Sequence, residues 1–507
     1  MLHTRSRSGC CPRRPPTGVS LAIAVLVPLG CARTERFDPG QVERHEPFAG
    51  APAGFLLGAA TSAHQIEGGN QNDWTDWEAG SYPDGRPHVR AHASARVAAD
   101  SWNRYPSDVE ALELLGANVY RFGIEWSRLE PSEGSWNVEA VHRYRDMLQA
   151  LRRATPQPIT PMLNLYHFTL PRWVAARGGW EWPGAVAAFA AFAGRAGEAF
   201  GDLVDLWCTL NEPNVYATKG FLSAEWPPGV RDPPRAARVL ATLIRAHGAA
   251  ARALRARDRV AADRPGGPPT RIGLAHNVRV FEPASRANPL DWLVVHFADG
   301  FYNRALTDAI ATGRIRVWLP TAISIDEPDP ELRGSLDWLG LNYYTRDQVH
   351  ARLSGMLGGG GSPYEVVPPR GEDLDGPLGG VSDLGWPIHP EGLLRELRAF
   401  SAYGWPLIVT ENGLADAAGG RRPAFIRSHV FAVDEARRGG VDVIGYLHWS
   451  LIDNFEWSHG YAGRFGLFSI DFEHDPTLRR TPTPAVATFR ELARQLGLHP
   501  AADPRWP

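Results

Sequence analysis

Eight short, β-rich apolar runs, each followed by helical sequence, predict an α/β fold, a closed parallel (β/α)8 TIM barrel forming a single domain with long βα loops. No stretch between about residues 54 and 498 has the composition of an interdomain linker. The alternative architecture, an open doubly wound sheet, normally carries a glycine-rich phosphate turn after an early strand. Neither GxGxxG nor GxxxxGK occurs in the chain. We therefore expect one barrel over residues 53–498.

The predicted strands are short apolar runs, and the sequence between them has helical periodicity. The strands are Phe55–Thr61, Asn118–Trp126, Ile159–Phe168, Val204–Asn211, Ile272–Val280, Trp338–Tyr344, Pro406–Glu411 and Val443–Ser450. The helical stretches are Ser107–Leu115, Glu139–Arg153, Ala185–Phe200, Ala236–Arg257, Leu290–Thr312, Pro390–Phe400 and Arg422–Gly439. After the sixth strand, a glycine-rich excursion over about residues 345–385 predicts a flexible loop at the barrel mouth, or else a tolerated insertion.

The N-terminus has the pattern of an export signal. A basic segment precedes the apolar run Val19–Leu29, which is too short to span a bilayer comfortably. A small residue and then Cys31 follow, so we expect residues 1–31 to be a signal peptide of lipoprotein type, with a retained membrane anchor as the alternative. Residues 32–52 are Pro-rich and predict a tether, and residues 499–507 form a C-terminal tail. The expected location is the periplasm or outer surface of a bacterium, with membrane attachment through a lipidated Cys31.

Composition excludes several classes of function. The chain has 53 Lys and Arg against 56 Asp and Glu, whereas nucleic-acid binders carry a strong basic excess. Its four cysteines form no CxxC pair and no HExxH motif occurs, so we expect no disulfide framework, no metal and no cofactor. Cys208 is expected to face the barrel core. The 18 tryptophans are numerous, and indole rings stack on sugar rings as well as filling cores.

Polar and aromatic side chains gather at the ends of the predicted strands, where barrels of this type carry their active sites. Glu212 follows the fourth strand and Glu411 ends the seventh. A single Glu in such a place is more often a structural group. Two of them, accompanied by Arg, His, Asn, Tyr and Trp from the other strand ends, are harder to explain as structure. The sequence has no GxSxG elbow that would indicate a serine nucleophile instead.

Paired carboxyl groups among hydrogen-bonding and aromatic residues suit the cleavage of a glycosidic bond. One carboxylic acid protonates the leaving oxygen, and the other carboxylate attacks or stabilises the anomeric carbon. The sequence separation of the two residues says nothing about their distance in space. A gap of roughly 5 Å would give retention of anomeric configuration, and roughly 6.5–9.5 Å would give inversion.

Four segments resemble glycoside hydrolase family 1, the family of retaining β-glucosidases and β-galactosidases, and the match runs from about residue 53 to about 497. Phe55–Gly68 is similar to the family's N-terminal signature, and His448–Trp457 resembles its sugar-binding segment. Thr209–Pro213 matches the acid/base motif and Val409–Gly413 the nucleophile motif. The resemblance implies a single barrel domain with a retaining mechanism.

The resemblance also implies a role for each residue at the predicted barrel mouth. Glu411 would be the nucleophile and Glu212 the acid/base catalyst. The residues that would lie beside the nucleophile are Arg121, Asn342 and Tyr344. The residues that would bind the nonreducing sugar, together with Tyr344, are Gln65, His167, Asn211, Trp449, Glu456 and Trp457. The structural alternatives are a barrel salt bridge for Arg121, a core hydrogen bond for His167 and simple packing for the two tryptophans.

Two segments depart from the usual family pattern. Phe168-Thr169 stands where the family usually has Trp-Asp, and the segment Asn72–Trp77 is compact. The shape of one pocket wall and the preference for a leaving group therefore cannot be inferred for this chain from the family. Phospho-sugar hydrolases of the family tend to replace Glu456 with a small residue and to add a lysine nearby, whereas the one lysine of this chain is Lys219. Because Glu456 would repel a dianionic phosphate, we expect unphosphorylated sugars.

The leading hypothesis is an exported retaining exo-β-glycosidase, with β-glucosidase as the leading assignment. Its substrate would be a small-molecule or oligosaccharide β-glycoside, hydrolysed by double displacement. Two alternatives remain open: a transglycosylase that uses the same site, and a non-catalytic sugar-binding surface protein. The sequence does not decide between glucose, galactose, fucose and mannose, and it leaves the oligomeric state open.

Overall fold

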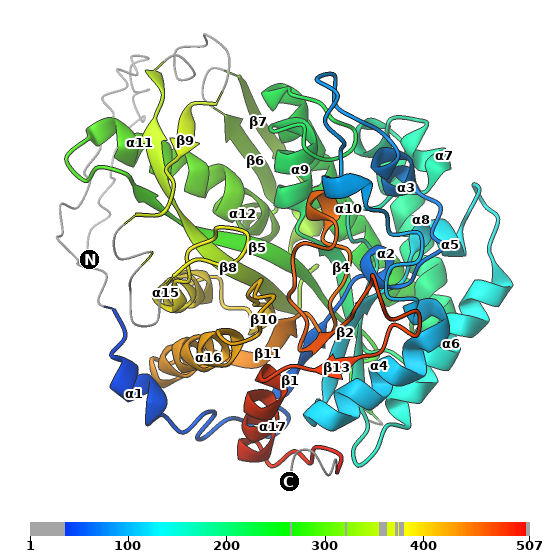
Figure 1. Ribbon diagram of the computed structural model, residues 1–507. Helices are drawn as coiled ribbons and strands as arrows, with labels where there is room; N and C mark the ends of the chain where they lie inside the picture. The colour runs from blue at the N-terminus through cyan, green and yellow to red at the C-terminus, as the bar shows by residue number, and fades with distance from the viewer. Residues whose placement is uncertain are drawn as a thin grey trace, which may run out of the picture. The chain divides into compact units, whose positions relative to one another are not determined.

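All eight predicted strands are present and close into a parallel barrel (Figure 1). In order around the barrel they are β1 (Leu56–Ala60), β2 (Val119–Gly123), β3 (Thr160–Asn164), β4 (Leu206–Asn211), β5 (Arg271–Pro283), β8 (Trp338–Ala351), β10 (Leu407–Glu411) and β11 (Val443–Trp449). Neighbouring strands pair in parallel all the way round. Leu56–Ala60 lies in register with Gly445–Trp449, which closes the ring and confirms the (β/α)8 TIM barrel.

The computed structural model describes residues 36–263, 266–319, 322–353, 362–370, 374 and 380–502. The predicted signal peptide, residues 1–31, lies outside these ranges. Phe37 onward forms a single unit, which contains the barrel. Within the described ranges, no helix combines the length and the apolar character that crossing a membrane requires.

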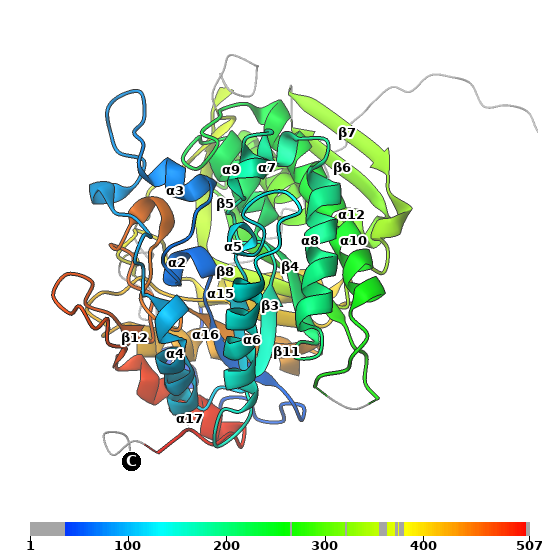
Figure 2. The same ribbon diagram turned by 90° about the vertical axis from the view of Figure 1, so that its right-hand side faces the viewer.

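Helices cover the outside of the strands (Figure 2). The longer ones are α4 (Ser101–Leu115), α6 (Val138–Arg152), α8 (Ala185–Phe200), α10 (Pro233–Arg257), α11 (Pro289–Asp299), α12 (Ala305–Thr312), α15 (Pro390–Ser401), α16 (Arg422–Arg438) and α17 (Ala485–Gln495). Short helices at the mouth are α2 (Ala63–Ile66), α3 (Asp73–Glu78), α5 (Trp126–Leu129), α7 (Arg172–Ala175) and α9 (Pro213–Phe221). The side chains of Asn137 and Asp232 accept backbone N–H groups at the starts of α6 and α10, which fixes where these helices begin.

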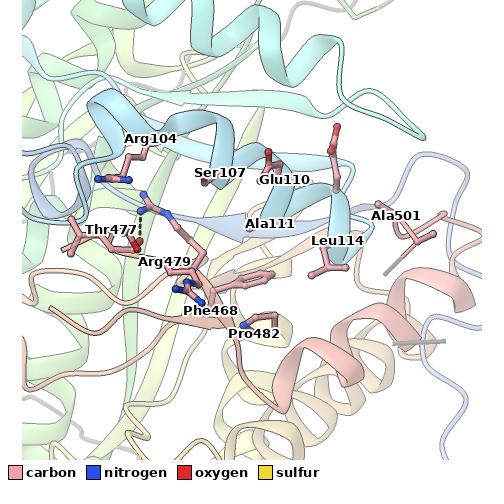
Figure 3. Close-up of a pocket in the computed structure, with 14 residues that line it drawn as sticks. Arg104, Ser107, Glu110, Ala111, Leu114, Phe468, Thr477, Arg479, Pro482 and Ala501 are labelled. Atoms are coloured by element: carbon pink, nitrogen blue, oxygen red, sulfur yellow. Dashed lines mark hydrogen bonds between the residues drawn. The ribbon is translucent and has the colours of Figure 1, made fainter. Parts of the chain in front are cut away.

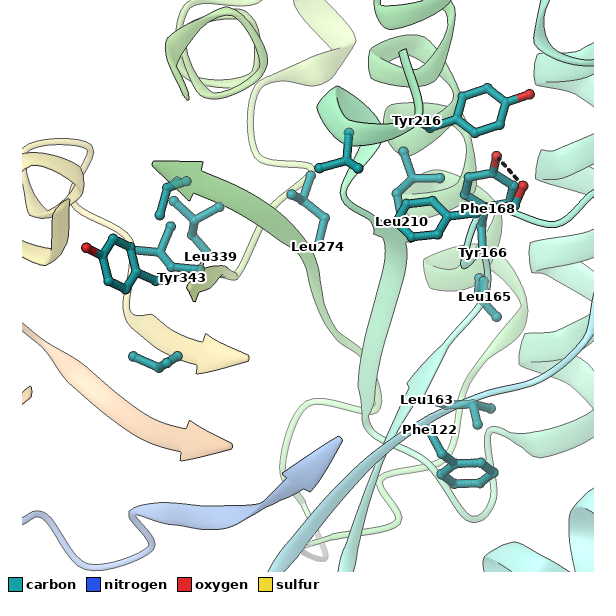
Figure 4. Packing of buried hydrophobic residues seen from close by; sticks show 14 of the residues in the cluster. Phe122, Leu163, Leu165, Tyr166, Phe168, Leu210, Tyr216, Leu274, Leu339 and Tyr343 are labelled. Carbon is teal, nitrogen blue, oxygen red and sulfur yellow. Dashed lines mark hydrogen bonds between the residues drawn. The ribbon is translucent and has the colours of Figure 1, made fainter. Parts of the chain in front are cut away.

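The core has two layers, one inside the barrel and one between the strands and the helices. Inside, Met162, Leu206 and Cys208 pack together, so Cys208 faces the barrel core as expected. Outside, a larger cluster includes Phe122, Leu163 and Leu274 from three different strands (Figure 4). Successive residues of a strand point to opposite faces, so each strand serves both layers and most of its residues are buried.

Two strands that the sequence analysis did not predict form a hairpin outside the barrel. β6 (Arg314–Leu319) and β7 (Ile323–Pro328) pair antiparallel. In addition, β8 continues to Ala351 and pairs with β9 (Tyr364–Val366). The predicted loop after the sixth strand is therefore partly a strand extension. The glycine run 358–361 lies outside the described residues.

The predicted tether is not free over most of its length, which corrects the sequence interpretation. Phe37 lies edge-on to Phe431 of α16 with ring centroids 4.9 Å apart. Helix α1 (Pro39–Glu43) follows, and the backbone N–H of the buried Phe48 donates to the Asp434 carboxylate at 2.7 Å. Apolar burial and this buried carboxylate hold the segment against the barrel's helical layer, so its Pro content does not indicate a tether from Phe37 onward.

The C-terminal tail is partly ordered against the same unit. The N–H of Ala501 donates to the carbonyl of Glu113 at the end of α4 at 2.8 Å. The guanidinium of Arg490, on α17, donates to the carbonyl of Ala501 at 3.0 Å. Residues 503–507 lie outside the described ranges.

Candidate active site

Glu411 is the last residue of β10 and is buried at the C-terminal end of the barrel strands. Its Oε1 accepts a short hydrogen bond from Nη1 of Arg121, which is buried on β2. Its Oε2 accepts a hydrogen bond from Tyr344 Oη at 2.7 Å. Burial raises the pKa of Glu411, and both donors oppose that rise. A cation and a phenol on the two carboxylate oxygens favour the ionised form that a nucleophile needs.

The turn after Glu411 depends on a glycine. A Cβ atom on Gly413 would lie 1.9 Å from the carbonyl oxygen of Trp449. The two strand ends can therefore come this close only without a side chain at that position. Asn412 between them accepts the N–H of Trp449 through its carbonyl at 3.0 Å. These contacts hold the ends of β10 and β11 side by side and bring Glu411 and Trp449 to the same site.

Arg121 also links the nucleophile position to β4. Its Nη2 donates to Oδ1 of Asn211 at 2.6 Å, and the same oxygen accepts Nδ2 of Asn342 at 3.0 Å. Nδ2 of Asn342 further donates to Glu212 Oε1 at 2.8 Å. Glu411, Arg121, Asn211, Asn342 and Glu212 therefore form one continuous hydrogen-bonded network. The structure thus brings the two predicted carboxyl groups together at one site.

Glu212 sits in a strained turn directly after β4. Its φ of 46° lies in the left-handed region, and its N–H donates to the Ala275 carbonyl on β5 at 2.8 Å. Pro213 then begins α9, where its missing N–H costs no hydrogen bond. Burial, followed by the charge of Glu411, raises the pKa of Glu212 to about 7. A carboxyl group with that pKa holds its proton well above the range of an ordinary glutamate.

His167 and Gln65 are oriented by neighbouring polar groups, His167 by the amide of Asn211 and Gln65 by the hydroxyl of Ser62. Asn211 Nδ2 lies 3.0 Å from His167 Nε2, and burial lowers the pKa of His167 well below its usual value, which keeps the ring neutral. Gln65 Oε1 accepts Ser62 Oγ at 2.7 Å, so its Nε2 points to the Phe455 carbonyl at 2.8 Å and to Glu456 Oε2 at 3.3 Å. His167 and Gln65 therefore have fixed orientations at the site.

Glu456 is the third carboxyl group of the site and is half-buried. Burial, then the charges of Glu411 and Glu212, raise its pKa to about 8, while hydrogen bonds from Gln65 and Trp449 oppose the rise. Such a group can accept hydrogen bonds from sugar hydroxyls when ionised and donate one when protonated. Because the pKa values of Glu212 and Glu456 are both raised, the three carboxyl groups of the site do not all carry full charge at neutral pH.

The two tryptophans stack with histidines and close one wall. Trp449 lies 5.8 Å from His167 with an interplanar angle of 21°. Trp457 is stacked with His64 at 5.7 Å and with His167 at 5.9 Å. Both are buried among the polar site residues, which is the arrangement of a platform for a ring with one apolar face. With them, every residue predicted for the site lies in one contiguous cluster.

The departure at Phe168-Thr169 is accommodated by neighbouring groups. Phe168 packs on Trp226 with centroids 4.7 Å apart and lies edge-on to Trp457. Thr169 Oγ1 donates to the Glu125 carboxylate at 2.9 Å, so Glu125 has a structural hydrogen-bond partner. Glu67 is likewise paired with Arg128 at 3.1 Å. Neither of these two glutamates is hydrogen-bonded to Glu212 or Glu411, so both have structural contacts instead.

The sequence analysis missed two residues that touch or support the acid/base position. Asn277 on β5 donates from Nδ2 to Glu212 Oε1 at 2.8 Å, and Tyr302 Oη donates to Asn277 Oδ1 at 2.7 Å. The fifth strand had no assigned functional residue because it matches no motif. The available signal was the polar pair His276-Asn277 inside the otherwise apolar buried run Ile272–Val278.

A cavity of about 430 Å³ elsewhere on the surface is separate from this site (Figure 3). It lies between α4 and the segment Thr477–Pro482, with charged side chains such as Arg104 and Glu110 on its walls. None of the predicted site residues lines it.

The comparisons with known proteins agree with the geometry. The family model described as glycosyl hydrolase family 1 matches residues 48–498. A β-galactosidase from Pyrococcus woesei is 31% identical, covering 88% of this chain and 98% of its own length. β-Glucosidase A from Thermotoga maritima is 32% identical, covering 83% and 93%. The structure of a β-glucosidase from Thermotoga maritima in complex with glucoimidazole superposes with a TM-score of 0.76 at 29% identity, covering 90% of this chain and 100% of that one.

The family match covers almost the whole barrel and includes both carboxyl-bearing strand ends, and the hydrogen-bonded network joins those ends in space. Together these findings identify the protein as a glycoside hydrolase, and the chain belongs to glycosyl hydrolase family 1.

Proposed function

We propose that the protein is a retaining exo-β-glycosidase, and within that class a β-glucosidase, with Glu411 as nucleophile and Glu212 as acid/base catalyst. The observation that carries the proposal is the unequal environment of the two carboxyl groups. Arg121 and Tyr344 donate to both oxygens of Glu411. Glu212 faces no cation so closely, and its pKa is raised to about 7. One group is thus held as a carboxylate while the other keeps a proton, which double displacement requires.

In the first step, the Glu411 carboxylate attacks the anomeric carbon as the glycosidic C–O bond breaks, and Glu212 gives its proton to the leaving oxygen. The product is a glycosyl ester of Glu411, whose negative charge is lost. With that charge gone, the pKa of Glu212 falls, since Glu411 is the second cause of its rise. Glu212 can then take a proton from water as the water oxygen attacks the anomeric carbon and displaces Glu411.

The remaining residues bind the sugar in this proposal. Asn211, fixed by Arg121 and Asn342, is placed to hold the 2-hydroxyl, whose hydrogen bonds strengthen in the oxocarbenium-like transition state. Gln65, His167 and Glu456 are placed for the other hydroxyls, and Trp449 and Trp457 for the ring face. Buried polar groups of this kind discriminate between sugars more sharply than apolar packing does. In its ionised form, Glu456 would also disfavour a phosphorylated sugar through charge repulsion.

The curated relatives include a β-galactosidase and β-glucosidases, which supports a β-glycoside substrate and leaves the sugar to be decided. A panel of nitrophenyl β-glycosides of glucose, galactose, fucose and mannose compares kcat/KM directly. Product analysis at high acceptor concentration separates hydrolysis from transglycosylation on the same site. Absence of turnover with the whole panel would favour a sugar-binding role instead.

Glu411→Ala tests the nucleophile assignment. We expect hydrolysis to be abolished, and azide or formate to restore part of the activity by filling the space of the lost carboxylate. Azide attacking from that face of a dinitrophenyl β-glycoside gives the α-glycosyl azide. In the matched variant Glu212→Ala, azide replaces water in the second step and gives the β-glycosyl azide. Full activity of Glu411→Ala, or the opposite azide anomers, would contradict the assignment.

We also propose that the chain is exported and that Cys31 carries lipid. The support is the sequence pattern alone: a basic segment, a short apolar run and a small residue before Cys31. The attachment would hold the barrel at a membrane surface without a spanning helix.

A further inference from the structure

The acid/base residue is held by two amides on one of its oxygens. Asn277 Nδ2 and Asn342 Nδ2 each donate to Glu212 Oε1 at 2.8 Å. No side chain or backbone group among the described residues forms a hydrogen bond with Oε2 of Glu212. The carboxyl group is therefore asymmetric before any substrate arrives: one oxygen accepts two N–H groups and the other is left for the leaving group.

Each amide is locked in orientation by a hydroxyl group. Tyr302 Oη donates to Asn277 Oδ1 at 2.7 Å, and Thr410 Oγ1 donates to Asn342 Oδ1 at 2.7 Å. An amide whose oxygen already accepts a hydroxyl must present its N–H side to Glu212. The tyrosine thus decides which end of Asn277 faces the carboxyl group, although it does not touch Glu212 itself.

Tyr302 lies in a π-helical turn that positions its side chain. The turn is η3 (Gly300–Arg304), between α11 and α12. Asn303 in the same turn accepts the N–H of Arg279 at 3.1 Å and donates to its carbonyl at 2.8 Å, which fixes the turn against β5. Nδ2 of Asn214, two residues after Glu212, donates to the carbonyls of Asn277 and Tyr302 at 2.8 and 3.0 Å. The turn at Glu212, β5 and η3 are therefore joined by three sets of hydrogen bonds, two of them buried.

We propose that Asn277 and Tyr302 are a positioning pair that confines the acidic proton of Glu212 to Oε2. This deepens the proposed function and rests on it. An oxygen that accepts two N–H groups is the carbonyl oxygen of a carboxylic acid, so the O–H bond forms at the other oxygen. Oε2–H then gives its proton to the glycosidic oxygen as the C–O bond breaks. In the second step Oε2 recovers a proton from the attacking water.

The pair also affects the acidity of Glu212. The ionisable groups that face it from other elements, judged by their electrostatic coupling to it, are Arg121, Glu411, Glu456, Tyr302 and Tyr344. The amides of Asn277 and Asn342 stabilise the carboxylate and lower the pKa of Glu212, against burial and the charge of Glu411, which raise it. Removing the Asn277 donor should therefore raise that pKa and move the basic limb of kcat/KM to higher pH.

The test compares two leaving groups in Asn277→Ala and Tyr302→Phe. An alkyl β-glycoside needs protonation to leave, whereas a dinitrophenyl β-glycoside does not. We expect kcat/KM for the alkyl substrate to fall about tenfold in each variant, the loss expected for one hydrogen bond to the carboxylate that develops as Glu212 gives up its proton. For the dinitrophenyl substrate we expect a change of less than about twofold. In Asn277→Ala, the basic limb of the pH profile of kcat/KM should move to higher pH by about one unit.

Tyr120→Phe is the matched control. It removes another buried tyrosine hydroxyl of the barrel, which bonds to Thr61 away from Glu212. We expect no leaving-group dependence in this variant. If Tyr302 acts through Asn277, the double variant should lose no more than Asn277→Ala alone. Equal losses for both leaving groups, or additive losses in the double variant, would overturn the inference.

Glu212→Ala separates this inference from the proposed function. That variant should show the strongest leaving-group dependence and produce the β-glycosyl azide. If it does and the variants of Asn277 and Tyr302 do not, the positioning role fails and the catalytic assignment stands. If Glu212→Ala shows no such dependence, the acid/base assignment itself fails. Tyr302→Phe keeps the ring that packs beside Arg279, so it tests the hydroxyl even if Asn277→Ala does not fold.

Discussion

At the scale of single residues, two glutamates of the same chemistry are made different by what donates to them. Glu411 receives a guanidinium and a phenol, one on each oxygen. Glu212 receives two amides on a single oxygen. Charged donors stabilise a carboxylate more than neutral amides do, so the proton is held at Glu212. The division of roles thus comes from neighbouring side chains on three different strands, β2, β5 and β8.

Tyr344→Phe tests one of these donors. Its hydroxyl lowers the pKa of Glu411, so removing it should raise that pKa. Activity is lost as pH falls through the pKa of the nucleophile, and the acidic limb of kcat/KM should therefore move to higher pH. We expect a shift of about one pH unit, seen as roughly tenfold lower kcat/KM on the acidic side. The pH–rate profile measures it.

The neighbouring residue supplies the control. Tyr343→Phe removes a buried hydroxyl that donates to the His389 carbonyl, outside the catalytic network. The acidic limb of kcat/KM in Tyr343→Phe should lie at the same pH as in the wild-type protein. A shift of the same size in both variants would mean that the hydroxyl of Tyr344 acts through general packing.

Much of the site could be predicted from sequence because its residues stand in local motifs at strand ends. Glu212 and Glu411 each follow an apolar strand and have recognisable neighbours. Asn277 could not be found that way, because its importance comes from a partner on another strand and from Tyr302 on a distant helical turn. Contacts of this kind depend on tertiary structure, and they produce no regular spacing of residues along the sequence that could be recognised.

At the scale of elements, the barrel strands were predictable and the hairpin was not recognised. The barrel strands are continuous apolar runs, buried on both faces. β6 instead alternates, with Ile315 and Val317 buried and Arg316 and Trp318 exposed. That alternation was visible in the sequence, but the segment is short and directly follows a helical stretch. The prediction of a tether over residues 32–52 was wrong from Phe37 onward for a different reason. It gave the proline content more weight than the apolar residues Phe37 and Phe48, which pack against the rest of the protein.

Phe48→Ala tests whether the segment after α1 is part of the folded unit. Phe48 is buried and packs on Phe55 with centroids 4.9 Å apart. Truncating a buried phenylalanine costs about 3–5 kcal/mol. For a chain of this length, that should lower the thermal midpoint by roughly 3–5 °C. It should also expose the segment to limited proteolysis.

Val97→Ala is the control, because Val97 is 54% exposed and its truncation should change stability by less than about 0.5 kcal/mol. If Phe48→Ala behaves like Val97→Ala, the segment acts as a free tether after all.

At the scale of the whole molecule, the position of Phe37 limits how far the barrel could lie from a lipid on Cys31. The unit that contains the barrel begins at Phe37, and few residues stand between it and Cys31. A fully extended chain spans at most about 3.5 Å per residue, which limits this link to roughly 20 Å. If Cys31 carries lipid, the barrel stays close to the membrane surface. Substrates would then be hydrolysed near that surface.

Labelled palmitate tests the lipid attachment on the full chain expressed in a bacterium. We expect the label to enter the wild-type protein and to be absent from Cys31→Ser, which should also be released from the membrane fraction, because acyl chains supply most of the binding energy of such an anchor. The double variant Cys10→Ser/Cys11→Ser should keep the label, since both cysteines lie in the segment that the proposed cleavage would remove. Label in Cys31→Ser, or none in the wild type, would contradict attachment at this position. Loss of label in the double variant alone would instead place the lipid on the leader, and the N-terminus would then be a retained anchor.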